Sequence, residues 1–207
     1  MTYLSTKEFR FINTSKKCCV GFIDLVNSTA DALSIIDEVK LEAYSLFINN
    51  TTKIIKKYDG IVKNIGDCLL FYFPKTDYKR KINELNKVLE CFIDILQRRN
   101  RLNDDLIEEN LPPFNYRITI DYGPLYFALT GVVNQIDIFG SIINICSKLK
   151  SLSMPNTVNI GENLYLRFLS FPVFAHIYKF SYSGEYTITD KNNYEFTLLL
   201  KLMKSQT

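Results

Sequence analysis

The order of apolar and polar residues along the chain predicts strands separated by two long helices. The apolar run 18–24 has the length of a buried strand and ends on Asp24. The stretches at about 31–58 and 78–101 repeat their apolar residues with the 3.6-residue period of an amphipathic helix. The first half of the chain therefore alternates strand and helix.

Residues 61–73 predict a hairpin of two short strands, because Gly66-Asp67 favours a tight turn. Pro74 follows and stops the second strand. The remaining expected elements are a polar loop at 103–113, a strand at 114–121, a turn at Gly123-Pro124 leading to an apolar stretch that ends near Gly131, a short helix at 140–151, a strand at 157–160, a helix at about 161–169 and two or three C-terminal strands.

This order of elements predicts an α+β fold. We expect a ferredoxin-like βαββαβ core with extra C-terminal strands, in which helices cover one face of a mostly antiparallel sheet. No Pro-, Gly- or Ser-rich linker interrupts the 207 residues, so a single domain over 1–207 is expected.

Composition excludes several classes of function. The net charge of +3 is too small to indicate nucleic-acid binding. No run of about 18 apolar residues occurs, and the N-terminus lacks a signal-peptide pattern, so we expect a cytoplasmic protein without membrane insertion. The five cysteines lack metal-site spacing and predict free buried thiols. The single histidine, His176, lies in an apolar stretch and makes a Ser-His-Asp triad improbable.

Two carboxylates are the strongest candidates for chemistry. Asp24 ends a strand and Asp67 lies at the tip of the hairpin, so the two converge if these strands are neighbours. Such a pair suits Mg²⁺ or Mn²⁺, and two ions about 3.5–4 Å apart would serve phosphoryl chemistry. Backbone N–H groups around Asn27, Ser28 and Thr29 would suit a phosphate. The residues alone leave another interpretation open, in which Asp24 caps a helix and Asp67 only stabilises the hairpin turn.

Several segments in this order resemble motifs of the class III nucleotidyl cyclases. The resemblance covers about residues 17–168, and its strength lies in the order and spacing of motifs that are individually weak. The matching segments are Phe22-Ile-Asp-Leu-Val-Asn-Ser-Thr29, Asp59-Gly-Ile-Val-Lys-Asn-Ile-Gly-Asp67, Tyr116-Arg-Ile-Thr-Ile-Asp-Tyr-Gly-Pro124, Asp137-Ile-Phe-Gly-Ser-Ile-Ile-Asn-Ile-Cys-Ser-Lys-Leu149 and Ser151-Leu-Ser-Met-Pro-Asn-Thr-Val-Asn-Ile160.

The resemblance implies a nucleotidyl cyclase that makes a 3′,5′-cyclic monophosphate and pyrophosphate from a nucleoside triphosphate. Asp24 and Asp67, assisted by the Leu25 carbonyl, would hold two divalent cations, Mg²⁺ or Mn²⁺. Lys63 and Asp137 match the residues that read adenine, which favours ATP over GTP.

The same resemblance assigns Asn144 to the ribose. Lys148 stands where most members have an arginine that stabilises the transition state, and lysine lacks the planar fork of arginine. Lys179 and Lys191 both remain candidates for the family's late phosphate-binding lysine. The resemblance further implies a head-to-tail homodimer with shared active sites, because metal and base residues of one site come from different subunits.

Two alternatives remain open. Some stand-alone bacterial relatives make cyclic CMP or UMP as alarms in anti-phage defence, and the bare architecture of this chain fits them. The chain would otherwise be a degenerate cyclase that binds nucleotide as a partner protein without turnover, which the lysine at 148 favours and the retention of Asp24 and Asp67 opposes.

Overall fold

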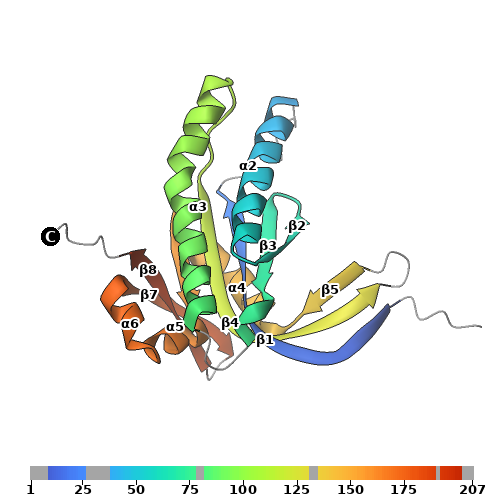
Figure 1. Ribbon diagram of the computed structural model, residues 1–207, viewed down its shortest axis with the longest axis vertical. Coiled ribbons are helices and arrows are strands. Elements are labelled where there is room, and N and C mark those ends of the chain that lie inside the picture. The colour runs from blue at the N-terminus through green and yellow to red at the C-terminus, as the bar shows by residue number, and fades with distance from the viewer. Residues whose placement is uncertain (1–8, 27–37, 78–81, 131–134, 190–191, 202–207) are drawn as a thin grey trace, which may run out of the picture.

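The computed structural model describes residues 9–26, 38–77, 82–130, 135–189 and 192–201 (Figure 1). In chain order the elements are β1 (Phe9–Leu25), α2 (Glu38–Lys57), β2 (Ile61–Ile65), β3 (Cys68–Phe73), a 3₁₀ turn (Pro74–Asp77), α3 (Ile82–Glu108), β4 (Tyr116–Thr130), β5 (Gln135–Phe139), α4 (Ser141–Leu152), β6 (Val158–Gly161), α5 (Glu162–Leu169), α6 (Pro172–Ile177), β7 (Tyr178–Thr189) and β8 (Asn192–Lys201).

The strands in this part of the chain form one eight-stranded sheet in the order β2-β3-β1-β4-β6-β8-β7, with β5 pairing β4. Every neighbouring pair is antiparallel except β4 and β6, which are parallel. The expected α+β class with a mostly antiparallel sheet is confirmed.

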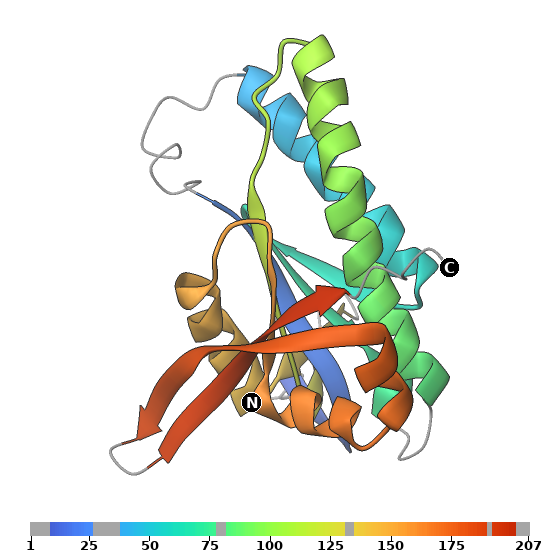
Figure 2. The ribbon, with the colours of Figure 1, turned by 90° about the vertical axis from the view of Figure 1, so that its left-hand side faces the viewer.

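Both faces of the sheet are covered. Alternate residues of β1 point to opposite sides: Cys19 and Ile23 pack in the core beneath α2 and α3, whereas Val20 and Phe22 pack in a second cluster with α4. Figure 2 shows α4 on the opposite side of the sheet from α2 and α3. The expectation that the helices share one face is therefore corrected for α4.

The hairpin is formed as the sequence predicts. Gly66 lies between β2 and β3 with a φ of 62°, a left-handed conformation that glycine adopts without strain. The second strand ends at Phe73, immediately before Pro74. The expected first helix begins at Glu38 in the described residues, since 27–37 lie outside them.

The polar loop expected at 103–113 is wrong in its first half, because α3 continues to Glu108. Leu106 of this extension is buried against Ala43 and Leu111, which extends the apolar face of the helix. Asn103 is also buried, and its side chain donates to the Phe114 carbonyl at 3.0 Å and accepts from the Phe114 amide at 2.9 Å. Asn103 can therefore be buried within the helix, because its side chain forms hydrogen bonds with the amide and carbonyl of Phe114.

The turn expected at Gly123-Pro124 is also wrong. β4 runs through both residues, which pair with Cys18 and Lys17 of β1. Gly123 is required there by packing, because a Cβ atom at this position would lie 2.9 Å from the Cβ of Ile142 on α4. The glycine therefore marks a close helix-to-strand approach.

The pattern along the chain also gave no signal for β5 or for the short helix α6. His176 lies in the last turn of α6 and is exposed, so it is not part of the core that its apolar neighbours suggested. All five cysteines are buried and unpaired, as predicted. Burial raises the pKa of the Cys18 and Cys19 thiols to about 12, so both remain protonated at neutral pH.

The beginning of β1, the end of β4 and β5 extend together away from the body of the molecule (Figure 1). Phe9, Phe11 and Phe139 form an exposed aromatic cluster on this arm, with ring centroids 5.3, 5.7 and 5.4 Å apart. No helix of the described segments is long and apolar enough to cross a membrane.

The role of Asn103 is testable by stability. Asn103→Ala leaves the amide and carbonyl of Phe114 without their partner, and we expect the free energy of unfolding to fall by about 1–3 kcal/mol. Asn100→Ala, on the exposed side of the same helix, should change it by less than about 0.5 kcal/mol. Urea unfolding followed by circular dichroism measures both, and equal effects of the two substitutions would contradict the assignment.

Candidate active site

The two candidate metal carboxylates lie at the same end of the sheet. Asp24, the penultimate residue of β1, is paired with Cys68 of β3 on one side and with Arg117 of β4 on the other. Asp67 directly precedes Cys68 in the hairpin turn, so the register places it next to Asp24. Asp24 is 6% exposed, whereas Asp67 is only partly buried.

Two cations contact Asp24, and the sequence interpretation identified neither. The Lys150 Nζ atom on α4 lies 2.9 Å from Asp24 Oδ1, and Arg117 Nε lies 3.3 Å from Oδ2. Both carboxylate oxygens of Asp24 are therefore engaged by positive charge. Arg117 could have been found from the strand register, since it stands directly opposite Asp24, but Lys150 reaches Asp24 only through the packing of α4 on the sheet.

The electrostatics of this end of the sheet favour oxygen ligands. Burial lowers the pKa of Lys150, but the Asp24 carboxylate outweighs it with help from Cys68 and Asp67, so the pKa is raised and Lys150 remains an ammonium. Burial raises the pKa of the Cys68 thiol to about 12, which leaves it a poor ligand at neutral pH. The remaining donors are the carboxylates.

Lys63 and Asp137 form an ion pair that joins β2 to β5. Four steps in strand order separate β2 from β5, which would place them about 19 Å apart in a flat sheet. The pair therefore exists only because the sheet curls. The structure thus brings together two residues that lie 74 positions apart in the sequence and were expected to read one base.

Asn144 and Lys148 lie one turn apart on the exposed side of α4. The opposite side of this helix, with Ile142, Cys146 and Leu149, is buried against the sheet. Asn144 and Lys148 thus face outward, while Lys150 turns toward Asp24.

The remaining candidate residues are Leu25, Lys179 and four that the structure does not describe. Leu25 is buried at the end of β1 next to Asp24, and Lys179 is exposed on β7. The candidates that lie outside the described residues are Asn27, Ser28, Thr29 and Lys191.

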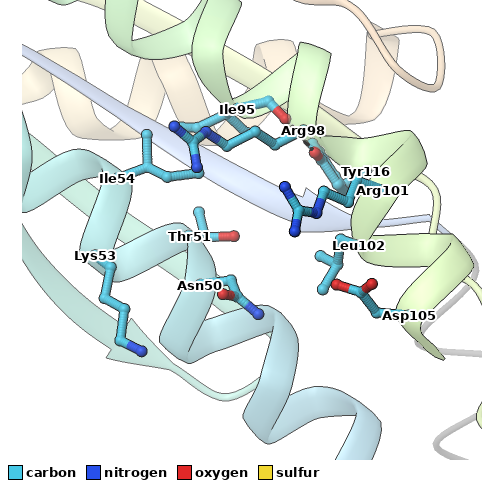
Figure 3. Close-up of a pocket in the computed structure, with 10 residues that line it drawn as sticks. All are labelled: Asn50, Thr51, Lys53, Ile54, Ile95, Arg98, Arg101, Leu102, Asp105 and Tyr116. Atoms are coloured by element: carbon cyan, nitrogen blue, oxygen red, sulfur yellow. Dashed lines mark hydrogen bonds between the residues drawn. The ribbon is translucent and has the colours of Figure 1, made fainter. Parts of the chain in front are cut away.

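Two cavities lie in the part of the chain that the structure describes, and none of the candidate residues in that part lines either. One, of about 350 Å³, lies between α2 and α3 and includes Lys53, Arg98 and Arg101 in its lining (Figure 3). The other, of about 500 Å³, lies beside α4 and includes Lys17, Ser141 and Arg167.

Comparison with known proteins decides the family. Residues 12–201 match the family model of the adenylate and guanylate cyclase catalytic domain. The chain belongs to this family. The class III resemblance seen in the sequence motifs is thereby confirmed, over a longer range than the motifs alone covered.

Among curated proteins, the chain is 27% identical over 167 residues to a cytidylate cyclase of Staphylococcus aureus and 23% identical over 175 residues to a cytidylate cyclase of Escherichia coli. These matches cover 77% and 76% of this chain but only 38% and 37% of the relatives, so the chain spans less than two fifths of their length.

Solved structures show the same fold. The adenylyl cyclase CyaB from P. aeruginosa superposes with a TM-score of 0.77 at 18% identity, covering 94% of this chain and 98% of that one. The guanylyl cyclase Cya2 superposes with a TM-score of 0.75 at 12% identity, covering 94% and 96%.

Cyclase catalytic domains use divalent metal ions, and the donors of this cyclase domain fit such ions. Asp24 at the end of β1 and Asp67 in the β2–β3 turn would offer hard carboxylate oxygens, which suit Mg²⁺ and Mn²⁺ rather than softer metals. Within the described segments, no group of three or more His, Cys, Asp or Glu side chains gathers in a metal-like cluster.

The contacts of Asp24 predict a difference between the two carboxylates. Asp24→Asn removes the charge that two partly buried cations share, so we expect the free energy of unfolding to fall by about 1–2 kcal/mol. Asp67→Asn, in a partly exposed turn where none of the described residues forms an ion pair with Asp67, should change it by less than about 0.5 kcal/mol. Urea unfolding in the presence of a chelator separates these effects, and equal losses would show that the Asp24 contacts do not stabilise the fold.

Proposed function

We propose that this domain is a nucleotidyl cyclase that converts a nucleoside triphosphate into the 3′,5′-cyclic monophosphate and pyrophosphate. One observation carries the proposal most directly. Asp24 and Asp67, from two separate motifs, lie at the same end of the sheet, where Asp67 directly precedes the residue paired with Asp24, in a domain of the cyclase family.

In this reaction the ribose 3′-oxygen attacks the α-phosphorus, its proton is lost to solvent, and the bond to the β-phosphate oxygen breaks to release pyrophosphate. Two Mg²⁺ or Mn²⁺ ions held by Asp24, Asp67 and the Leu25 carbonyl would lower the pKa of the 3′-hydroxyl and neutralise the triphosphate. The backbone of Asn27, Ser28 and Thr29 would hold phosphate oxygens.

The exposed side of α4 supplies the remaining groups. Asn144 orients the ribose, and Lys148 places a positive charge against the phosphates as charge builds during attack. A lysine supplies this charge without the bidentate grip of an arginine, so we expect catalysis to continue at reduced efficiency.

The Lys63–Asp137 pair favours a base that carries an exocyclic amine next to an acceptor nitrogen. The carboxylate accepts from the amine and the ammonium donates to the ring nitrogen. Adenine offers this arrangement at its 6-amino group and N1, and cytosine offers it at its 4-amino group and N3. Guanine and uracil present the reverse pattern.

The two expected substrates, ATP and CTP, share this arrangement of donor and acceptor. ATP fits the Lys63–Asp137 pair, and CTP fits it equally well, in keeping with the cytidylate cyclases among the curated relatives. If CTP is the substrate, the product is a cyclic pyrimidine nucleotide, and we extend to it the expected role as an alarm in anti-phage defence. Nucleoside triphosphates and five reduced cysteines both suit the cytoplasm.

The placement of the candidate residues supports a homodimer with shared sites. Asn144 and Lys148 face outward in one chain, so in the proposed dimer a second copy would present them to the Asp24–Asp67 pair. The exposed Phe9, Phe11 and Phe139 cluster on the projecting arm offers apolar surface for this contact.

The function is tested by incubating the protein with each of the four nucleoside triphosphates and Mn²⁺. We expect cyclic product and pyrophosphate from ATP, CTP or both, at rates at least about tenfold above those with GTP and UTP. Asp67→Asn should abolish turnover while the protein stays folded. An inactive wild-type protein that still binds nucleotide would instead identify a degenerate cyclase.

Exchanging the charges of Lys63 and Asp137 tests whether these two residues recognise the base. Lys63→Glu combined with Asp137→Lys keeps an ion pair but reverses its donor and acceptor, so the preference should move toward GTP and UTP. Each single substitution leaves two like charges and should lower activity with every base. An unchanged preference in the double variant would remove Lys63 and Asp137 from base recognition.

Shared sites are tested by mixing two inactive chains, Asp67→Asn and Asn144→Ala. A mixed dimer contains one site in which all residues are intact, so activity should return. With random pairing about half of the dimers are mixed, and recovery is limited to about a quarter of wild type. No recovery after verified subunit exchange would place each complete site within one chain.

A further inference from the structure

At the carboxylate end of the sheet, the charges of the four described side chains Asp24, Asp67, Lys150 and Arg117 sum to zero. Asp24 and Asp67 carry two negative charges, and Lys150 and Arg117 bring two positive charges to Asp24. The ammonium of Lys150 lies 2.9 Å from Asp24 Oδ1, one of the oxygens that a metal ion would use. A cation thus already occupies part of the ligand set.

The two cations differ in how firmly they are held. Arg117 stands in β4 directly opposite Asp24, and its Nη1 atom also donates to the Ser153 carbonyl at 3.4 Å. Lys150 lies in the last turn of α4 with its side chain 28% exposed, and its ammonium ends a flexible four-carbon stem. Arg117 is therefore the fixed partner of Asp24, and Lys150 is the one that can move away.

We propose that Lys150 is the resident cation of this site, which excludes free divalent ions from Asp24 until the metal arrives with the nucleotide. The inference rests on the proposed function, because it assigns the metal ligands to Asp24 and Asp67. Lys150 contacts no metal in this role; it sets the affinity of the carboxylates for one.

The physical basis is charge competition. A free divalent ion that approaches the balanced site gains little net attraction and must displace the ammonium from Asp24 Oδ1. A triphosphate brings several negative charges, so the displaced ammonium gains a phosphate oxygen as a new partner. Metal and nucleotide binding are consequently coupled, each strengthening the other by the same factor.

The test is a Mn²⁺ titration of the nucleotide-free protein, followed by the electron paramagnetic resonance signal of free Mn²⁺. We expect Lys150→Met, which keeps the length of the side chain and loses its charge, to bind Mn²⁺ at least about tenfold more tightly than wild type. Lys150→Gln should do the same, which covers the case in which the apolar methionine disturbs the fold.

Two controls test whether the effect depends on a positive charge at position 150. Lys150→Arg keeps the cation and should remain within about threefold of wild type, since the electrostatic competition is retained. Lys56→Met removes an equal charge from an exposed position near the C-terminal end of α2 and should leave the affinity unchanged. Unchanged or weaker Mn²⁺ binding in Lys150→Met and Lys150→Gln overturns the proposal, as does equal tightening in Lys56→Met.

A second readout separates this proposal from the proposed function. A non-reactive triphosphate analogue should raise Mn²⁺ affinity more in wild type than in Lys150→Met, because only wild type has an ammonium to displace. Asp24→Asn reports on the site itself. If Asp24→Asn binds Mn²⁺ as wild type does when the analogue is present, the metal site is misplaced and the proposed function fails; if it loses that binding while Lys150→Met changes nothing, only the role of Lys150 fails.

Discussion

The pairing of β1 with β4 is the constraint on which the rest of this domain depends. The ladder runs from Phe9 opposite Thr130 to Leu25 opposite Tyr116, with one irregularity after Ile12. At one end it sets Arg117 beside Asp24, and at the other it carries the projecting arm with β5. The carboxylate end and the aromatic arm are therefore fixed relative to each other by one set of backbone hydrogen bonds.

The sequence predicted those parts of the fold whose signal is local. Gly66 in the hairpin and the short helix that begins at Ser141 were expected within a residue or two. The errors arose where tertiary packing overrides a local signal. Gly123-Pro124 has the composition of a turn but continues a strand because both residues pair with β1, and Asn103 continues a helix because the backbone of Phe114 satisfies its amide.

The site shows the same division. Motifs indicated Asp24, Asp67, Lys63 and Asp137 as candidates, since each has a fixed place in a short segment. Lys150 has no such signal: in the sequence it is one of several lysines on an amphipathic helix, and its role appears only when α4 is packed on the sheet. Ion pairs across layers depend on three-dimensional approach, which hydrophobic periodicity does not encode.

The two ion pairs of the site differ in what a ligand must overcome. The Lys63–Asp137 pair is partly exposed, with side-chain exposures of 19% and 41%, and pairs of this kind contribute about 1 kcal/mol or less. A base that offers both a donor and an acceptor can therefore open it and satisfy both partners. Asp24 is nearly buried, so its charge must always be matched. In the proposed site, exchange of one cation for another keeps both oxygens of Asp24 matched, whereas loss of Lys150 alone leaves only Arg117. Metal entry and movement of the lysine would therefore belong to one step.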